Sequence, residues 1–208
     1  MARVTDTKER LLDAALQLIW DESLGAASVD AICERAEVRK GSFYHFFKSK
    51  EELVAAALEA HFKTARVDFD RIFSPSVAPI ERLKGFFELM VRKQQMKLEK
   101  AGRVVGCPYA SVAVACSGED KLVHDAIQEI LVTWRKYFET ALRDGAADGT
   151  IPVKDIPATV ETIFDYIEGA MTAGRIKNSM TPIMSMGSNA FKLLGLEWEA
   201  APVSSAKP

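Results

Sequence analysis

The sequence predicts an all-α fold. Apolar residues recur every three or four positions along most of the 208 residues, and no segment shows the alternation typical of a strand. Residues 28–53 contain two short helical segments separated by a tight turn, followed by the capped start of a long helix. We therefore expect about nine helices in an N-terminal helix-turn-helix domain (1–50), a helical second domain (51–198) and a disordered tail (199–208).

The first helices are bounded by capping residues. Asp6 with Glu9 three residues later predicts the start of a helix that extends to about Ser23. Ser28 is a candidate N-cap for the second helix. The next turn, near Glu37, is followed by a short third helix that contains Gly41, where a side chain would block the close approach of backbone or phosphate.

The third helix has two different faces. Phe43, Phe46 and Phe47 are spaced so that they pack onto the first two helices, while Tyr44 and His45 point away by the same periodicity. One face is therefore predicted to be core and the other to be free for a partner.

A fourth helix is predicted to run from about Lys50 to Phe73. Ser49 and Glu52 form a capping box at its start. A lysine in the first turn opposes the helix dipole, which suggests that Lys50 meets an external phosphate; the alternative is an indifferent surface lysine. SPSVAP then marks the domain boundary.

The second domain is predicted to contain five more helices. One includes Ile80–Val91, one begins at Pro108 and ends at Ser117-Gly118, one spans about 119–143, one follows Asp155 as N-cap, and one follows Thr181-Pro182. The segment from Asp144 to Thr150 is predicted to be a turn.

Charge is distributed unevenly. The whole chain carries a net charge of −2, so an extended polycationic binding surface is excluded. Between Arg35 and Lys50, however, five basic residues accompany one acidic residue. This local excess on the third helix and its flanks predicts binding of double-stranded DNA.

Other classes of function have little support. No nucleophile elbow, phosphate loop, acid/base pair or metal-ligand spacing is present, and the three cysteines form no compact set, so we expect no enzyme, metal or cofactor. MARVTDTKE contains no apolar run, and no stretch approaches the ~18 apolar residues that cross a bilayer. We therefore expect a cytoplasmic protein without a membrane partner.

Residues 6–53 resemble the tetracycline-repressor (TetR) family of bacterial transcription regulators. A helix containing Trp20 precedes SVDAICERAEVRKGSFYHFFKSKEEL, which is similar to the helix-turn-helix of that family. The resemblance implies an all-α homodimer that binds a near-palindromic operator and is released by a ligand. It also implies a set of DNA-contacting residues: Ser28, Arg39, Lys40, Gly41, Ser42, Tyr44, His45 and Lys50.

The last two long helices are the expected dimer surface. A helix-turn-helix covers one half-site, so two half-sites one turn apart require two-fold symmetry. Small residues allow close approach of a partner helix, and the family analogy points to the same place. The candidates are Ile163, Ile167, Ala170, Gly174, Met184 and Phe191.

The second domain holds more aromatic and sulfur-bearing side chains than a plain helical bundle requires. Most are expected to be core, and some to line an apolar pocket for a small effector. The candidates are Phe69, Phe87, Met90, Cys107, Tyr109, Trp134, Phe138, Phe164 and Tyr166.

Cys107 is the most specific candidate among them. It lies at the predicted start of a helix, a position that lowers the pKa of a thiol, and Arg103 is near in sequence. The Gly106-Cys107 pair resembles a branch of the family in which some members sense electrophiles. The effector is thus expected to be largely apolar or electrophilic. The alternative function is a ligand-independent DNA-binding accessory factor on the same fold.

Overall fold

The computed structural model describes residues 2–22, 24–116 and 120–198, and every regular element within these ranges is a helix. The predicted tail, 199–208, and the predicted helix end at Ser117-Gly118 lie outside the described residues. The helices are α1 (Ala2–Asp21), α2 (Val29–Arg35), α3 (Lys40–Phe46), α4 (Lys50–Ile72), α5 (Pro79–Ala101), α6 (Pro108–Ala115), α7 (Lys121–Ala147), α8 (Ile156–Lys177), α9 (Thr181–Met184) and α10 (Met186–Leu193).

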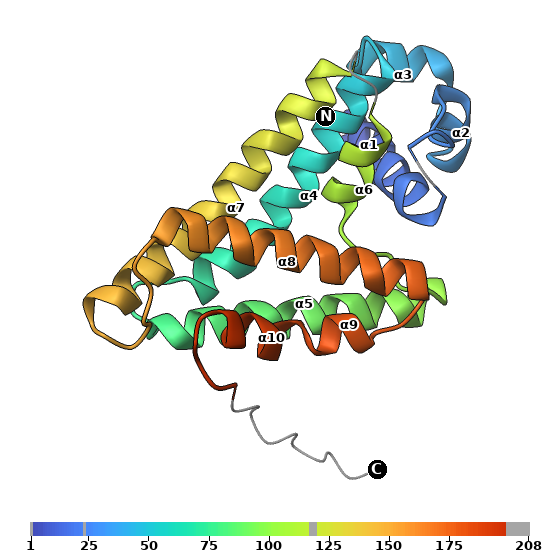
Figure 1. Cartoon of the computed structure of the whole chain (residues 1–208). Coiled ribbons are helices and arrows are strands. Elements are labelled where there is room, and N and C mark those ends of the chain that lie inside the picture. The colour runs from blue at the N-terminus through green and yellow to red at the C-terminus, as the bar shows by residue number, and fades with distance from the viewer. Residues whose placement is uncertain (1, 23, 117–119, 199–208) are drawn as a thin grey trace.

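The helices form two groups joined by α4 (Figure 1). Helices α1, α2 and α3 pack together at one end, and α4 packs against both α1 and α7. Helices α5, α8, α9 and α10 lie together at the other end, with α6 between the two groups (Figure 1). The predicted all-α architecture with an N-terminal helix-turn-helix is confirmed.

Three helix starts form as the capping residues predict. The Oγ of Ser28 accepts the Ala31 N–H at 3.1 Å, and the Oγ of Ser49 accepts the Glu52 N–H at 3.2 Å. Asp155 Oδ1 accepts the Ala158 N–H at 3.1 Å. These side chains satisfy backbone donors that the first turn of a helix leaves without partners.

Two predicted boundaries are wrong. Helix α1 begins at Ala2 rather than after Asp6, because no proline or glycine stops it before that position. Helix α7 continues through the expected turn to Ala147. There Asp144 pairs with Arg82 at 2.5 Å and Gly145 O accepts the Ile151 N–H at 2.9 Å, so tertiary contacts stabilise the glycine-bearing end.

The predicted last helix is divided into α9 and α10. Ser185 separates them, and its Oγ donates to Thr181 O at 3.0 Å. This competition with the backbone pattern interrupts the helix, so the described residues form ten helices rather than nine.

A single hydrophobic core extends from α1 to α10. Aromatic rings form its centre, with Phe86 and Phe138 4.8 Å apart between ring centroids. Cys33 is buried in this core. In the described part of the chain, none of the helices has the length and apolar character needed to span a membrane.

Candidate nucleic-acid interface and ligand cavity

Helix α3 has the two faces that its sequence predicts. Phe43 is fully buried and Phe47 nearly so, and Phe46 packs partly buried against the core. Tyr44 lies on the other face with 59 % of its surface exposed, and His45 is exposed beside it. The helix is therefore anchored by phenylalanines and presents polar aromatic groups to the solvent.

The turn before α3 is held in place by Arg10 of α1, a role that the sequence pattern did not indicate. Glu37 adopts a left-handed conformation with φ of 54°, and Val38 N–H donates to Cys33 O at 2.9 Å. The Arg10 guanidinium of α1 donates to Glu37 O at 2.8 Å. Arg10 thus ties the turn to α1 and fixes the direction in which α3 leaves it.

Two of the predicted DNA-contacting residues have partners within the protein. Lys40 pairs with Asp30 at 2.6 Å, and this contact raises the pKa of the ammonium. Ser28 uses its oxygen as a helix cap, which leaves its hydroxyl hydrogen available. Arg39 is exposed at the N-cap position of α3 and makes no capping hydrogen bond there.

Gly41 does not serve a close backbone contact within the chain. A Cβ at this position would meet no atom within 4 Å. Of the two reasons expected for a glycine here, approach of protein backbone is therefore wrong, and approach of an external group stays a prediction. Ser42 is half-buried next to it. Lys50 is the half-buried first residue of α4.

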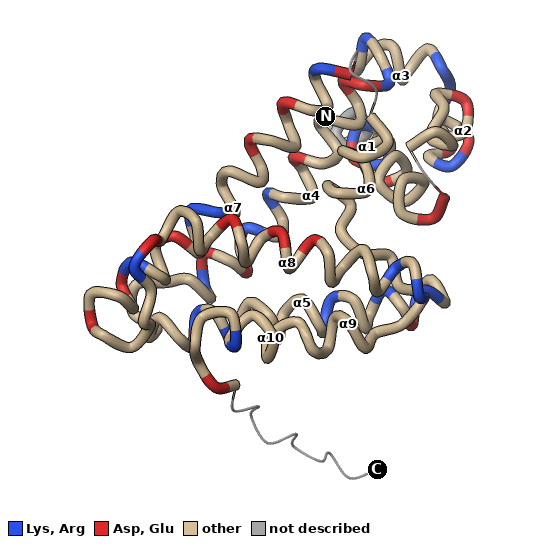
Figure 2. The backbone as a smooth tube through the Cα atoms, viewed as in Figure 1, with Lys and Arg blue, Asp and Glu red and all other residues tan. Residues whose placement is uncertain are grey.

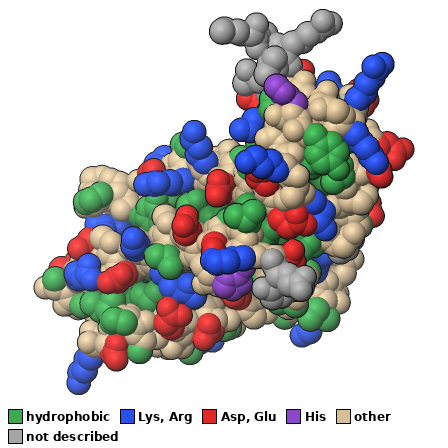
Figure 3. All heavy atoms as spheres, turned by 90° about the horizontal axis from the view of Figure 1, so that it is seen from above, with side chains coloured by type: hydrophobic (Ala, Val, Ile, Leu, Met, Phe, Trp, Pro, Cys, Tyr) green, Lys and Arg blue, Asp and Glu red, His purple; other side chains and the backbone are tan. Residues whose placement is uncertain are grey.

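Basic residues occur on α3 and around the start of α4, and acidic residues lie nearby on α2 and directly after the first residue of α4 (Figure 2). The view from the end that carries α3 shows basic and acidic side chains interspersed on the surface (Figure 3). The positive excess is thus local and modest.

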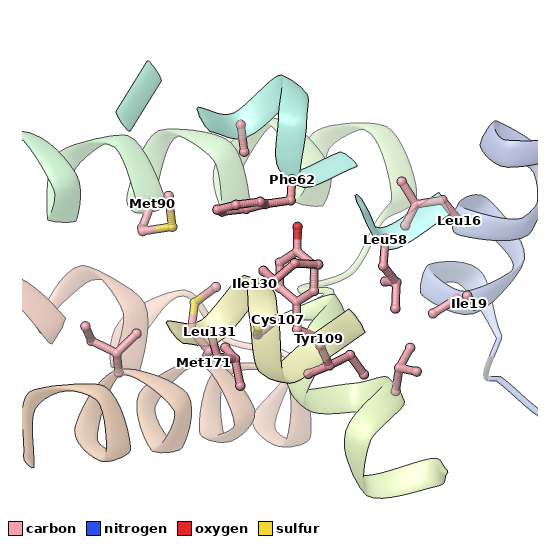
Figure 4. Packing of buried hydrophobic residues seen from close by; sticks show 14 of the residues in the cluster. Leu16, Ile19, Leu58, Phe62, Met90, Cys107, Tyr109, Ile130, Leu131 and Met171 are labelled. Carbon is pink, nitrogen blue, oxygen red and sulfur yellow. The ribbon is translucent and has the colours of Figure 1, made fainter. Parts of the chain in front are cut away.

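A cavity of about 80 Å³ lies between α4, α5, α6, α7 and α8. In Figure 4 the Tyr109 hydroxyl points toward α4, and the sulfur-bearing side chains of Met90, Cys107 and Met171 lie to one side of its ring. Six predicted ligand-binding residues line this cavity: Phe69, Met90, Cys107, Tyr109, Trp134 and Phe164.

The other three candidates lie elsewhere. Phe87 packs against Phe191 and Trp198, and Phe138 against Phe86, so both belong to the core beyond the cavity. The Tyr166 hydroxyl accepts a hydrogen bond from Asn189 at 3.0 Å and lines an open groove on α8. Their positions in three dimensions, rather than their residue type, exclude them from the cavity.

The cavity also has polar walls that the sequence analysis did not identify. His61 Nδ1 and the Tyr109 hydroxyl are 2.7 Å apart in a hydrogen bond, and burial lowers the pKa of His61 to about 4. Lys97 and Gln94 continue the face of α5 that carries Met90. Met90, Gln94 and Lys97 are four and three residues apart, so the sequence could have placed them on one face of the helix. No sequence pattern indicated that His61 contacts α6.

Lys97 also touches the helix-turn-helix group. Its Nζ lies 3.6 Å from the centroid of the Trp20 ring of α1. The edge of the His61 ring meets the same indole at a centroid distance of 4.9 Å, and Arg103 donates to Trp20 O at 2.9 Å. Two cavity residues therefore contact the end of α1 directly.

The expected activation of Cys107 is wrong. Cys107 occupies the N-cap position of α6 without a side-chain capping hydrogen bond. The nearby backbone N–H groups of Ala110 and Tyr109 lower the pKa of the thiol, but burial outweighs them and raises it to about 11. Arg103 does not help, since it is bound to Trp20 O. Cys107 is thus a protonated thiol at physiological pH, although it does line the cavity.

Most of the expected dimer residues lie inside the protomer. Phe191 is fully buried, Ile163 is 1 % exposed and Ile167 lines the cavity. Gly174 packs against Ile183, so that a Cβ would come within 2.8 Å of it. These four assignments are wrong because α8 and α10 pack against each other, α8 also packs against α7 and α9, and α10 also packs against α5.

A different face of the same helices is exposed. Met184 is 67 % exposed, and Ala170 lines the open groove. Ile176 on α8 and Leu193 on α10 are also exposed apolar residues, at 79 % and 53 %, whereas Ala170 itself is 8 % exposed. In the described ranges no cluster of three or more histidine, cysteine or carboxylate side chains could hold a metal ion.

Known proteins resemble the chain over nearly its whole length. The HTH-type transcriptional repressor DhaR of Mycobacterium sp. (strain GP1) is 25 % identical over 199 residues, 93 % of this chain and 94 % of the relative. The crystal structure of regulatory protein TetR from Rhodobacter sphaeroides has a TM-score of 0.74 at 25 % identity, covering 88 % of this chain and 95 % of its own. Reduced E. coli NemR shares the fold, with a TM-score of 0.76 at 19 % identity, covering 93 % and 100 %.

Two family models match the two parts of the chain. The description "Bacterial regulatory proteins, tetR family" covers residues 11–57, and "Tetracyclin repressor-like, C-terminal domain" covers residues 79–186. The first match contains the outward face of α3, and the second contains most of the cavity. The chain belongs to the tetR family of bacterial regulatory proteins, which are DNA-binding transcriptional regulators rather than enzymes.

Proposed function

We propose that the protein is a cytoplasmic, homodimeric transcriptional repressor that leaves a near-palindromic operator when a small effector binds. The proposal rests on a direct contact between the cavity and the helix-turn-helix. His61 and Lys97 line the cavity, and both contact Trp20 of α1. Occupation of the cavity can therefore act on the helix-turn-helix through direct contacts. Relatives named as repressors support the sign of regulation.

In this proposal residues 1–50 bind DNA and residues 51–198 bind the effector and a second copy. Tyr44 and His45 contact backbone or base edges, and Arg39 reads a base, since arginine pairs bidentately with guanine. Ser28 and Lys50 contact phosphates. Lys40 holds its phosphate from the ion pair with Asp30, and Gly41 and Ser42 lie against the groove.

Replacement of Tyr44 tests the interface. Tyr44→Ala is expected to weaken operator binding at least tenfold without lowering thermal stability, because the side chain is 59 % exposed. Val67→Ala, at a position 71 % exposed on α4, is the matched control and should bind normally. Fluorescence anisotropy with labelled operator measures both, and unchanged binding by Tyr44→Ala would contradict the assignment.

The dimer surface is proposed to be the exposed groove on α8, α9 and α10, with Ala170 and Met184. Gly169 offers a sharp test, since a Cβ there would meet no atom within 4 Å of its own protomer. Gly169→Arg should therefore leave the protomer folded but give monomers in analytical ultracentrifugation. Val67→Arg should remain dimeric, and a dimeric Gly169→Arg would require another surface.

Effector binding is proposed to be non-covalent, because burial keeps the Cys107 thiol protonated. Cys107→Ser is expected to leave operator release by the effector unchanged. If release by electrophiles were lost in this variant, and release by unreactive compounds were absent in the parent protein, the covalent alternative would replace the present one.

One observation favours the second candidate, a ligand-independent DNA-binding factor. The cavity, at about 80 Å³, is smaller than the roughly 300–1,000 Å³ of ordinary ligand pockets. Genome-wide mapping of bound sites separates the two functions. One or a few promoters would support the repressor, and many dispersed sites would support the accessory factor.

A further inference from the structure

Lys97 occupies a position between the cavity and the DNA-binding group. It lines the cavity and also the cleft between α1 and α5. Its ammonium rests 3.6 Å from the centre of the Trp20 ring. Among the described residues, no carboxylate lies within the 4.0 Å that defines an ion pair with it.

This arrangement leaves a half-buried cation without a counter-ion. Burial, with a smaller contribution from the neighbouring Lys93, lowers the pKa of Lys97 to about 8. Lys93 forms an ion pair with Asp68 at 2.8 Å, so the Asp68 carboxylate already has a partner other than Lys97. A cation in such a place gains from an anion that enters the cavity, because the ion is already partly desolvated.

A second donor in the cavity wall also has no partner. The indole N–H of Trp134 is buried and makes no hydrogen bond within the described part of the chain. The Tyr109 hydroxyl is occupied by His61. A buried donor without a partner costs free energy that an acceptor on a ligand would recover.

Glu168 is the opposing group and has to be considered. It lines the cavity from α8, and burial raises the pKa of its carboxyl, which Arg135 partly offsets. Glu168 therefore takes up a proton more readily than an exposed glutamate does, and His61, with its pKa of about 4, is neutral near pH 7. Of the two lysines that line the cavity, Lys93 is paired with Asp68, and Lys97 has no ion-pair partner among the described residues, so an anion is its complementary partner.

We propose that the cavity binds a small monocarboxylate whose carboxylate pairs with Lys97 and whose apolar part lies against Met90, Phe164 and Met171. This inference rests on the proposed ligand-responsive function. The cavity, at about 80 Å³, lies below the roughly 300–1,000 Å³ of ordinary ligand pockets, so the carboxylate is expected to have a short chain.

The pairing of the carboxylate with Lys97 also connects effector binding to release of the operator. An ammonium that pairs with a carboxylate in the cavity is drawn from the face of Trp20, because a desolvated ion pair is stronger than a cation–π contact. The end of α1 then loses this contact with α5, while Trp20 keeps its contacts with Arg103 and His61.

Butanoate, which has six non-hydrogen atoms, is the probe, compared with butanamide and butylamine by isothermal titration calorimetry on the full chain. We expect butanoate to bind at least tenfold more tightly than either analogue. Lys97→Met should abolish this preference, Lys97→Arg should retain it, and Lys100→Met, on the same helix but outside the cavity, should leave it unchanged. Circular dichroism verifies that each variant is folded.

Three results would overturn the inference: equal affinity for acid and amide, a preference for the amine through Glu168, or no binding of butanoate to the parent protein. A folded Lys97→Met variant with full preference would do the same. Operator affinity is measured in the same samples. Operator release by an uncharged compound, with no response to butanoate, would reject the carboxylate and keep the proposed repressor. Specific binding that no compound alters would reject the repressor model itself.

Discussion

Gln94 and Gly106 exchange two buried hydrogen bonds. The Gln94 Nε2 donates to Gly106 O at 2.9 Å, and the Gly106 N–H donates to Gln94 Oε1 at 3.2 Å. One side chain of α5 thus satisfies both backbone groups of a residue that precedes α6. These two bonds fix the path of the chain that leads into Cys107 and Tyr109.

Gln94→Leu should therefore destabilise the protein strongly. The leucine fills a similar volume but leaves the N–H and C=O of Gly106 buried without partners, at about 1–3 kcal/mol for each group. We expect a loss of about 3 kcal/mol in the free energy of unfolding, measured by urea denaturation. Gln95→Leu is the matched control, because Gln95 is exposed and bonds only Glu99. Equal effects of the two changes would show that the exchanged bonds contribute little.

Gly106→Ala is expected to cost more than Gly102→Ala. Both glycines have left-handed φ, 71° and 69°, so both changes carry backbone strain of about 1–2 kcal/mol. At Gly106 the new Cβ would also lie 3.2 Å from Met171 O, whereas at Gly102 it meets nothing within 4 Å. Thermal denaturation of the two variants isolates the steric part. A Tm for Gly106→Ala at or above that of Gly102→Ala would contradict the close contact.

Arg82→Met should destabilise the junction of α5 and α7. Arg82 is 3 % exposed, pairs with Asp144 at 2.5 Å and donates to Val77 O at 2.7 Å. Its removal leaves a carbonyl and a carboxylate without their donor, and we expect a loss of about 3 kcal/mol. Arg143→Met, which removes an exposed pair with Glu139, should cost less than about 1 kcal/mol. Urea unfolding at pH 7 measures both, and similar losses would refute the special role of Arg82.

His61 predicts a loss of stability in mild acid. Its pKa is about 4 in the folded protein and near 6.5 in its ordinary state, so between these values the unfolded chain binds more protons. Stability from this group is complete above pH 6.5 and falls as the pH drops toward 4, by up to about 3 kcal/mol. His61→Gln should flatten the unfolding free energy measured between pH 7 and pH 5, relative to the parent.

His124→Gln is the control for that experiment, since His124 is exposed on α7. It should retain the parental slope. A parental slope in His61→Gln would mean that the acid sensitivity comes from other groups.

The helix-turn-helix could be predicted from sequence because its determinants are local. Ser28, Ser49 and Glu52 act within one helical turn, and the faces of α3 follow from the spacing of its phenylalanines. The end of α7 could not, because Asp144 and Gly145 are helical only through contacts with Arg82 and Ile151.

The cavity was predictable in composition but not in membership. Phe69 and Phe87 look alike in sequence, yet one lines the cavity and the other packs against Phe191. The prediction of a lowered pKa for Cys107 failed for the same reason. The position of the residue at a helix start can be read from the local sequence, whereas its burial depends on the surrounding helices. Likewise, small and apolar residues on α8 indicated close helix packing but not whether the neighbour is α10 or a second copy.

Helix α4 contains both His61, which lines the cavity, and Lys50, which is proposed to contact DNA. It contains no proline or glycine between Lys50 and Ile72, so it has none of the residues at which helices usually kink. His61 lies eleven residues after Lys50, about 16 Å along the axis. A tilt of about ten degrees at His61 would therefore carry Lys50 sideways by about 3 Å, roughly the length of one hydrogen bond to a phosphate.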